Sequence, residues 1–291
     1  MRVALEDKHV GGGGRSGTTR ATSGFSLIEM AVALFVLALL IGSILVPIST
    51  QVESRKYNET QIVLEQAREA LIGYAAATGR LPCPATQATN GREAFLSPPV
   101  GNTSNGLCDS AVTGTAGTNV YVGFLPAVTL GFTPIDSSGL ALDAWGLAQN
   151  RVRYAVSFQT VNGVFRPFTT LPTSTAGMRA AGMANITGQS LLNVCSAAPV
   201  PASPTACSPA STTLASNAVA VIWSLGPNAA TTGGTSTDEA LNAQAFTSAD
   251  RVFVSKVKSG GPGDANEFDD VVTWISPPVL FNRLIAAGQL P

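Results

Sequence analysis

An apolar run near the N-terminus, residues 25–48, constrains the fold of this chain more than any other feature of its sequence. Its 24 residues, wound as an α-helix, would extend about 36 Å, which is enough to cross the hydrocarbon core of a bilayer. The preceding residues 1–24 are polar and glycine-rich, with four basic residues against two acidic ones. Because basic flanks remain in the cytoplasm, we expect a single span with a cytoplasmic N-terminus and the rest of the chain on the far side.

Two residues distinguish this run from an ordinary membrane anchor. Glu29 lies inside it, where a carboxylate without a partner costs at least a few kcal/mol in lipid. A secretory signal places small residues and its cleavage site after the apolar stretch. Here the small residue, Gly24, stands before the stretch, so cleavage there would keep the helix in the mature protein. The alternative is an ordinary signal anchor with a stray acid near the interface.

Residues 24–29, Gly-Phe-Ser-Leu-Ile-Glu, followed by the apolar helix, resemble the type IV prepilin signature of type IV pilins and type II secretion pseudopilins. The resemblance implies that prepilin peptidase cleaves between Gly24 and Phe25 and removes leader 1–24. It also implies N-methylation of the new Phe25 amine, and pairing of Glu29 with the Phe25 ammonium group of a neighbouring subunit. This pairing would attract neighbouring subunits and also fix their register along the filament, because a buried charge without a partner is costly.

Residues 49–80 have the pattern of an amphipathic helix that continues the apolar run. Apolar side chains recur at i, i+4 and i+7 or i+8, which forms one stripe suited to covering a sheet. The stripe consists of Ile62, Val63, Ala67, Ala70, Leu71 and Tyr74. Gly79 is a suitable C-cap, and Pro82 prevents continuation. We therefore expect a helix that ends on a globular domain of residues 81–291.

The globular domain is low in charge and rich in loops. β-Branched and aromatic residues predict five short strands, at 120–125, 152–158, 218–225, 251–257 and 270–275. Segments 168–190, 196–217 and 227–248 are rich in Ser, Thr, Ala, Gly and Pro and are expected to be loops. The predicted fold is α+β and pilin-like, with the long N-terminal helix packed on an antiparallel sheet and long loops stapled by disulfides.

The four cysteines, Cys83, Cys108, Cys195 and Cys207, all lie in the loop-rich parts. In an oxidising compartment we expect disulfides, and the sequence-local pairs Cys83–Cys108 and Cys195–Cys207 are the economical choice among three pairings. Each would contribute about 3 kcal/mol in the chain-entropy model. The alternative is a metal site, but the chain has no C-x-x-C and no histidine after His9.

Three further stretches resemble the major pseudopilin of type II secretion. Residues 142–146 with Tyr154 are similar to its Asp-x-Trp-Gly…Tyr stretch, and residues 223–228 and 268–274 to its Ser-Leu-Gly and Asp-Asp-Ile…Trp elements. The C-terminal loop of that family binds calcium through carboxylate and main-chain oxygens, which are the hard ligands that Ca²⁺ requires. The resemblance implies calcium as the candidate cofactor. The available carboxylates are Asp264, Glu267, Asp269 and Asp270. The alternative is a solvated acidic turn before a strand.

Charge and histidine content exclude several classes of function. With 17 basic and 18 acidic residues the net charge is −1, which argues against a nucleic-acid partner. The single histidine, His9, lies in the leader, so the mature chain can form neither a Ser-His-Asp triad, nor a Cys-His pair, nor a histidine-based zinc site. We find no catalytic constellation and expect no enzyme activity.

Together these features predict a structural subunit, a pseudopilin or minor pilin, of a type II secretion or type IV pilus filament. We expect it in the bacterial inner membrane with its globular domain in the periplasm, and in a periplasmic or surface filament after assembly. The expected partners are prepilin peptidase, other subunits, the inner-membrane assembly platform and membrane lipid. The alternative is a membrane-anchored extracytoplasmic ligand-binding module with no filament role. An anchored hydrolase would need an active site without histidine.

Overall fold

The computed structural model describes most of the chain outside the leader. The described residues are 24–96, 107–112, 119–164, 166–171, 177–200, 202–203, 205–230, 236–248, 250–261 and 263–290, without the side chains of 42–50, 110 and 245–248. The predicted leader, apart from Gly24, therefore lies outside the described residues. The chain divides into two compact units, Met1–Gln51 and Val52–Pro291, and each is described by itself.

Helix α1, Leu27–Thr78, supplies residues to both units. In the second unit its buried face carries Leu64, Ala67, Leu71 and Ala75, each at most 1% exposed. This face includes Ala67 and Leu71 of the predicted stripe, and Val63 and Ala70 pack against the same core, whereas Ile62 is 58% exposed and does not belong to it. The predicted C-cap is confirmed. Gly79 has a φ of +78°, and its N–H donates to the Ala75 carbonyl at 2.7 Å.

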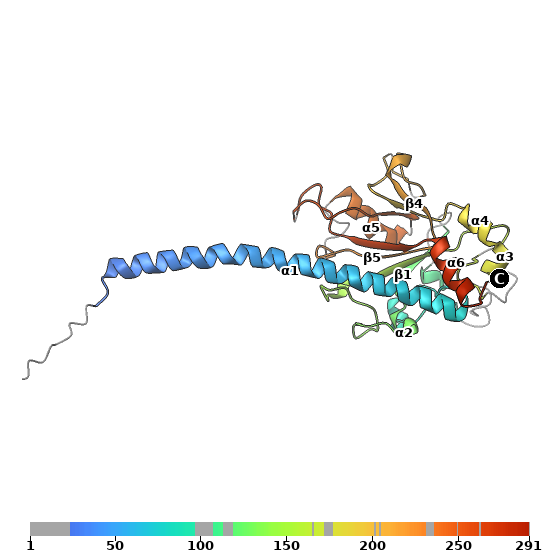
Figure 1. Ribbon diagram of the computed structural model, residues 1–291, viewed down its shortest axis with the longest axis horizontal. Coiled ribbons are helices and arrows are strands. Elements are labelled where there is room, and N and C mark those ends of the chain that lie inside the picture. Colours follow the sequence, from blue (N-terminus) through green and yellow to red (C-terminus); the bar gives the residue numbers. More distant parts are fainter. Residues whose placement is uncertain are drawn as a thin grey trace, which may run out of the picture. The chain divides into compact units, whose positions relative to one another are not determined.

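A four-stranded antiparallel sheet forms the centre of the second unit, with strand order β1-β2-β5-β7 (Figure 1). Its strands are β1 Val120–Phe124, β2 Arg153–Ser157, β5 Ala220–Ser224 and β7 Val271–Ile275. All four were predicted from the sequence, and the observed strands are one to three residues shorter. In the register, Tyr154 lies opposite Ile222 and Val221 lies opposite Trp274.

A second sheet corrects the expectation of a single antiparallel one. It has the order β4-β3-β6, from β4 Thr213–Ala218, β3 Leu192–Cys195 and β6 Val252–Val254. Strands β3 and β4 are antiparallel, whereas β3 and β6 are parallel. The strand expected at 251–257 is therefore present but belongs to this sheet. Most of β4 lies in a segment predicted to be a loop, since this strand is largely exposed and small polar residues dominate it.

The four-stranded sheet is buried on both faces. Alternate residues such as Tyr154 and Ile222 join the hydrophobic core that contains Leu71 of α1. The residues between them, such as Val221 and Trp223, join a second core with Phe253 of β6. The sheet thus lies between α1 on one side and the second sheet on the other (Figure 1). Burial on both faces explains why these strands are continuously apolar instead of alternating with polar residues.

Two more helices of ten residues or longer belong to the second unit. Helix α5, Thr237–Ser248, lies in a segment that was predicted to be a loop. Helix α6, Pro277–Ala286, begins with two prolines, which suit the first helical turn, and buries Leu280 and Leu284 in the first core. The shorter helices are α2 Ala127–Leu130, α3 Met178–Ala181 and α4 Met183–Thr187, with single 3₁₀ turns at Gln87–Thr89, Ser110–Val112, Ala148–Asn150 and Ala210–Thr212.

Two disulfides join the sequence-local pairs, Cys83–Cys108 and Cys195–Cys207. Both cysteines of the first pair are buried in the first core, at 0% and 1% exposure. Cys195 ends strand β3 and is fully buried, whereas Cys207 is only partly buried. The alternative of a cysteine metal site is therefore wrong.

Candidate functional site

The predicted cleavage bond lies just before α1. Gly24, Phe25 and Ser26 are not helical, and the helix starts with a hydrogen bond from the Met30 N–H to the Ser26 carbonyl at 3.1 Å. Gly24 is exposed, and no described atom outside its chain neighbours lies within 4 Å of where its Cβ would be. Phe25 is 78% exposed. The Gly24–Phe25 peptide bond is therefore open on all sides among the described residues, as a protease substrate must be.

Glu29 lies in the first turn of α1, where the helix dipole favours a negative charge. Its side chain is exposed, and no cation of the described residues lies within ion-pair distance of it. The first turn thus presents an exposed carboxylate that has no ion-pair partner among the described residues. Its predicted pairing with a neighbouring subunit concerns a second chain and stays a prediction.

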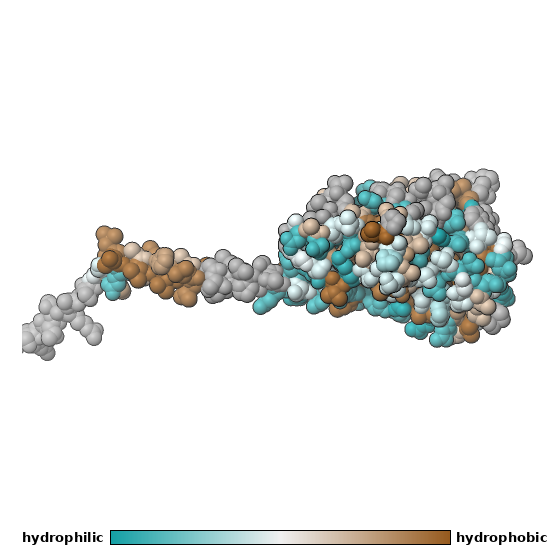
Figure 2. Space-filling view, turned by 90° about the horizontal axis from the view of Figure 1, so that it is seen from above, coloured by the Kyte–Doolittle hydropathy of each residue, from teal (hydrophilic) through white to brown (hydrophobic). Residues whose placement is uncertain are grey.

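The segment 25–41, here called the apolar segment, exposes its large hydrophobic side chains, and Figure 2 shows them covering the side in view. Its large apolar residues are 48–90% exposed: Phe25, Leu27, Ile28, Met30, Val32, Leu34, Phe35, Val36, Leu37, Leu39, Leu40 and Ile41. In the described part of the chain, no helix combines the length and the hydropathy needed to cross a membrane. The predicted span 25–48 includes residues 42–48, whose side chains lie outside that part.

Three carboxylates of the second unit form what we call the acidic cluster: Glu239, Asp269 and Asp270. Glu239 lies near the start of α5, and the two aspartates directly precede β7. The three residues are 1%, 4% and 2% exposed, and one oxygen from each lies within 4.8 Å of the others. The Asp269 N–H donates to Glu239 Oε1 at 2.9 Å, which fixes the two elements to each other.

Of the four carboxylates expected as calcium ligands, Asp269 and Asp270 belong to the acidic cluster, and Asp264 and Glu267 do not. Asp264 accepts a hydrogen bond from the Gly261 N–H at 2.7 Å, and Glu267 accepts one from the Gly263 N–H at 2.8 Å. Both therefore close the turn before the cluster by binding main-chain donors.

Glu239 is the member of the cluster that the sequence analysis missed. The run Ser236-Thr237-Asp238-Glu239 has the Ser-x-x-Glu spacing of a capping box, which would have predicted a helix start here. The Glu239 N–H donates to Ser236 Oγ at 3.3 Å, as that motif requires. The Glu239 side chain accepts from the Asp269 N–H and from Asn228 Nδ2, the latter at 3.0 Å.

Comparison with known families places a motif at the N-terminus of the chain. Residues 19–45 match the family model of the prokaryotic N-terminal methylation motif, which is the signature of type IV pilins and pseudopilins. The chain carries the type IV pilin-like signature. It implies a precursor that prepilin peptidase processes, assembly with other pilin subunits, and a membrane-anchored or extracellular protein. Comparison with curated proteins finds no match, and neither does comparison with solved structures.

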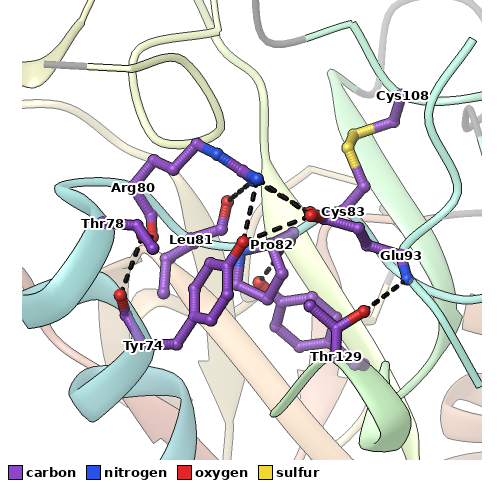
Figure 3. A network of polar contacts seen from close by, with 10 residues as sticks. Tyr74, Thr78, Arg80, Leu81, Pro82, Cys83, Glu93, Cys108 and Thr129 are labelled. Atoms are coloured by element: carbon purple, nitrogen blue, oxygen red, sulfur yellow. Dashed lines mark hydrogen bonds and ion pairs between the residues drawn. A yellow bond between two sulfur atoms is a disulfide. The ribbon is translucent and has the colours of Figure 1, made fainter. Parts of the chain in front are cut away.

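A buried ion pair marks the end of α1 (Figure 3). Arg80 donates two hydrogen bonds to the Glu93 carboxylate, both at 2.9 Å, and a third to the Tyr74 hydroxyl at 2.8 Å. The Cys83 N–H also donates to Glu93, at 3.2 Å. Burial raises the pKa of Tyr74 to about 12, and the nearby Glu93 adds to the shift. The network therefore fixes the last turn of the helix to the loop that Cys83–Cys108 closes.

The Asp-x-Trp-Gly stretch forms a buried turn beside β5. Asp143, 3% exposed, accepts from the Trp145 N–H at 2.9 Å, from Asn150 Nδ2 at 3.2 Å and from the Ser224 hydroxyl. Asn150 Nδ2 also donates to the Gly226 carbonyl. Burial raises the Asp143 pKa, while these hydrogen bonds oppose the shift. Two of the stretches that resemble the major pseudopilin thus meet here, the turn at 142–146 and the Ser-Leu-Gly at 224–226.

Proposed function

We propose that this chain is a structural subunit, a pseudopilin or minor pilin, of a type II secretion or type IV pilus filament, and that it is no enzyme. The observation that carries the proposal is the methylation motif at residues 19–45. Its cleavage bond is exposed and is followed by a helix with an apolar surface on every side. An apolar helical surface of this extent in one chain needs lipid or other subunits to cover it.

Glu29 gives the apolar segment its specificity for assembly. A carboxylate placed in lipid or in a filament interior is costly, and the ammonium group that cleavage would create at Phe25 supplies a partner of opposite charge. Because Glu29 lies four residues after Phe25 along the chain, identical chains that pair in this way must be offset along the filament axis. Membrane insertion with a periplasmic globular domain, before extraction by the assembly platform, belongs to the same proposal.

Mass spectrometry of the purified protein's N-terminus tests the processing step. We expect the mature chain to start at Phe25 with a methylated amine. A functional protein that retains residues 1–24, or that begins downstream of Ile48, would contradict the proposal.

Replacing Glu29 tests the filament role against a plain anchor. Glu29→Gln should leave processing, membrane association and folding intact but abolish recovery of sheared filaments or secretion. Glu59→Gln is the matched control, because Glu59 lies on the same helix and pairs with Arg55 on its surface at 2.7 Å. Unchanged assembly in Glu29→Gln would favour the alternative of an anchored ligand-binding module.

The Asp143 turn and the Asp-Asp…Trp element favour a type II secretion pseudopilin over a type IV minor pilin. A deletion strain separates the two, because loss of exoprotein secretion with normal pili supports the first, and loss of pili with normal secretion supports the second.

A further inference from the structure

The outer edge of strand β7 leaves main-chain groups without partners. The Ile275 carbonyl accepts from the Val219 N–H, next to β5, at 2.8 Å, whereas the Trp274 carbonyl accepts from Arg68 Nε of α1 at 3.0 Å. Main-chain groups of successive residues point to opposite edges of a strand, so those of Val272 share the outer edge with those of Trp274. The Val272 N–H, the Val272 carbonyl and the Trp274 N–H have no hydrogen-bond partner among the described residues. Strand β7 therefore offers these three groups to a strand beside it.

The other edges of the two sheets are blocked. On β1, the Phe124 N–H and carbonyl both pair with Ala85, each at 2.8 Å, and Val122 is only 5% exposed. On β6, the Asn242 side chain accepts from the Val254 N–H at 2.8 Å and donates to its carbonyl at 2.9 Å. Strand β4 shifts register twice against β3, and such bulges protect an edge from further pairing. Strand β7 has no charge, no proline and no register shift, so none of these protections applies to it.

A groove of about 400 Å³ lies beside the open edge of β7. Its lining residues come from β7, from α1 and from the stretch 255–258 that follows β6. Within this stretch, residues 256–258 make no main-chain hydrogen bond to any described residue, and Val257 is 86% exposed. Two separate segments with unpaired main chain thus border one groove, as they would if a strand between them were missing.

The charges at the groove favour one kind of extended peptide. Lys256 and Lys258 line it, and their side chains are 25% and 34% exposed. Lys256 pairs with Asp238, and Lys258 Nζ lies 3.8 Å from a Glu53 carboxylate oxygen, but neither acid lines the groove. The acidic residue that does line it, Asp270, is 2% exposed. The charge accessible from the groove is therefore positive and complements acidic side chains.

We propose that the groove between β7 and residues 255–258 binds an acidic, extended segment of a partner protein, which adds a fifth strand to the four-stranded sheet. Strand addition to an exposed edge is a recurring mode of peptide recognition, in which the main chain supplies affinity and alternate side chains supply specificity. The added strand pairs with Val272 and with the Trp274 N–H, and pairing stops at the Trp274 carbonyl because Arg68 occupies it. Residues 256–258 offer further main-chain groups, and the two lysines attract acidic side chains. The proposal concerns the second unit alone and does not depend on the filament role.

Calorimetric titration of the full-length protein in detergent tests the groove, with the end-blocked heptapeptide Glu-Val-Glu-Val-Glu-Val-Glu as the probe. We expect saturable binding of one peptide per chain. The same peptide with Lys in place of Glu should bind at least about tenfold more weakly, because it repels the two lysines. N-methylation of alternate peptide amides should also weaken binding at least about tenfold, because it removes main-chain donors. Absence of saturable binding up to about 1 mM peptide, or equal binding of the N-methylated peptide, would overturn the proposal.

Hydrogen exchange locates the added strand. In the free protein the Val272 and Trp274 amides should exchange quickly, whereas the Thr273 amide, which faces β5, should exchange slowly. The peptide should slow exchange at Val272 and Trp274 and leave Thr273 unchanged. Binding that protects neither outer amide would show that the peptide lies elsewhere, and would reject this groove.

Two variants separate strand addition from general attraction. Val272→Pro removes an outer N–H that the fold does not use, so the protein should fold while its affinity for the peptide falls at least about tenfold. Lys258→Gln should weaken binding of the acidic peptide, and Lys56→Gln is its matched control, because Lys56 does not line the groove. An equal effect of the two lysine variants would reject the charge argument, and this comparison stands even if Val272→Pro does not fold. Self-association of the full-length protein that the peptide reverses would assign the groove to a second copy of the chain and overturn the choice of partner.

Discussion

Arg80 and Glu93 form the most enclosed ion pair among the described residues, with side chains 4% and 14% exposed. Removal of one partner of a buried pair leaves the other charge uncompensated, which costs about 3–5 kcal/mol. Glu93→Gln should therefore lower the free energy of unfolding of the domain by about that amount, measured by chemical denaturation. Glu59→Gln removes a surface pair and should cost about 1 kcal/mol or less. Equal effects of the two variants would show that the Arg80–Glu93 pair stabilises the domain no more than a surface ion pair does.

Single residues also explain where the sequence was and was not informative about the site. Gly24, Phe25 and Glu29 could be proposed as site residues because their chemistry is local and lies in one short motif. The acidic cluster was only half found, because Glu239 reaches Asp269 across 30 positions of the sequence. No local sequence pattern predicts a contact between residues so far apart in the chain. Asp264 and Glu267 were chosen for their proximity in sequence, yet the turn uses their oxygens for its own N–H groups.

At the scale of elements, two residues of α1 show how the packing of this helix on the sheet stabilises the domain. Leu71 is fully buried in the first core, whereas Ile62 on the same helix is 58% exposed. Leu71→Ala should lower the free energy of unfolding by about 2–5 kcal/mol because it leaves a cavity. Ile62→Ala should change it by about 0.5 kcal/mol or less, as surface substitutions usually do. Denaturant midpoints of the two variants check this. A large effect of Ile62→Ala would show that Ile62 lies on the buried face of the helix, as the stripe predicted from the sequence requires.

Most elements with strong local signals were predicted, with helix α6 as an exception, and those defined by distant partners were not. The first sheet was found because its strands are short apolar runs with turn residues at both ends. Strand β4 is largely exposed and carries no such run, and the parallel pairing of β3 with β6 joins segments some sixty positions apart. Helix α5 has only its capping residue as a local signal. Its position depends on contacts with β6, such as the hydrogen bond from the Val254 N–H to Asn242 Oδ1 at 2.8 Å.

At the scale of the whole molecule, both hydrophobic cores are built from residues of the second unit, with Tyr57 the first to contribute. A fragment of residues 52–291 should therefore fold cooperatively without detergent, with the same denaturant midpoint as the full chain. A fragment of residues 72–291 lacks Leu64, Ala67 and Leu71, so it should lose cooperative unfolding. Circular dichroism during a urea titration distinguishes the two. Failure of the longer fragment to fold would show that residues 24–51 stabilise the domain.

Strand β5 is hydrogen-bonded on both edges, to β2 and to β7, and each of its faces belongs to a different core. No partial opening of one core alone can release its peptide groups to water. Deuterium should therefore enter the Val221 and Ile222 amides last, at a rate set by the complete opening of the domain. Exchange at those two amides would therefore report the complete opening of the domain. The effect of any ligand, subunit contact or mutation on this protein can be compared with that reference.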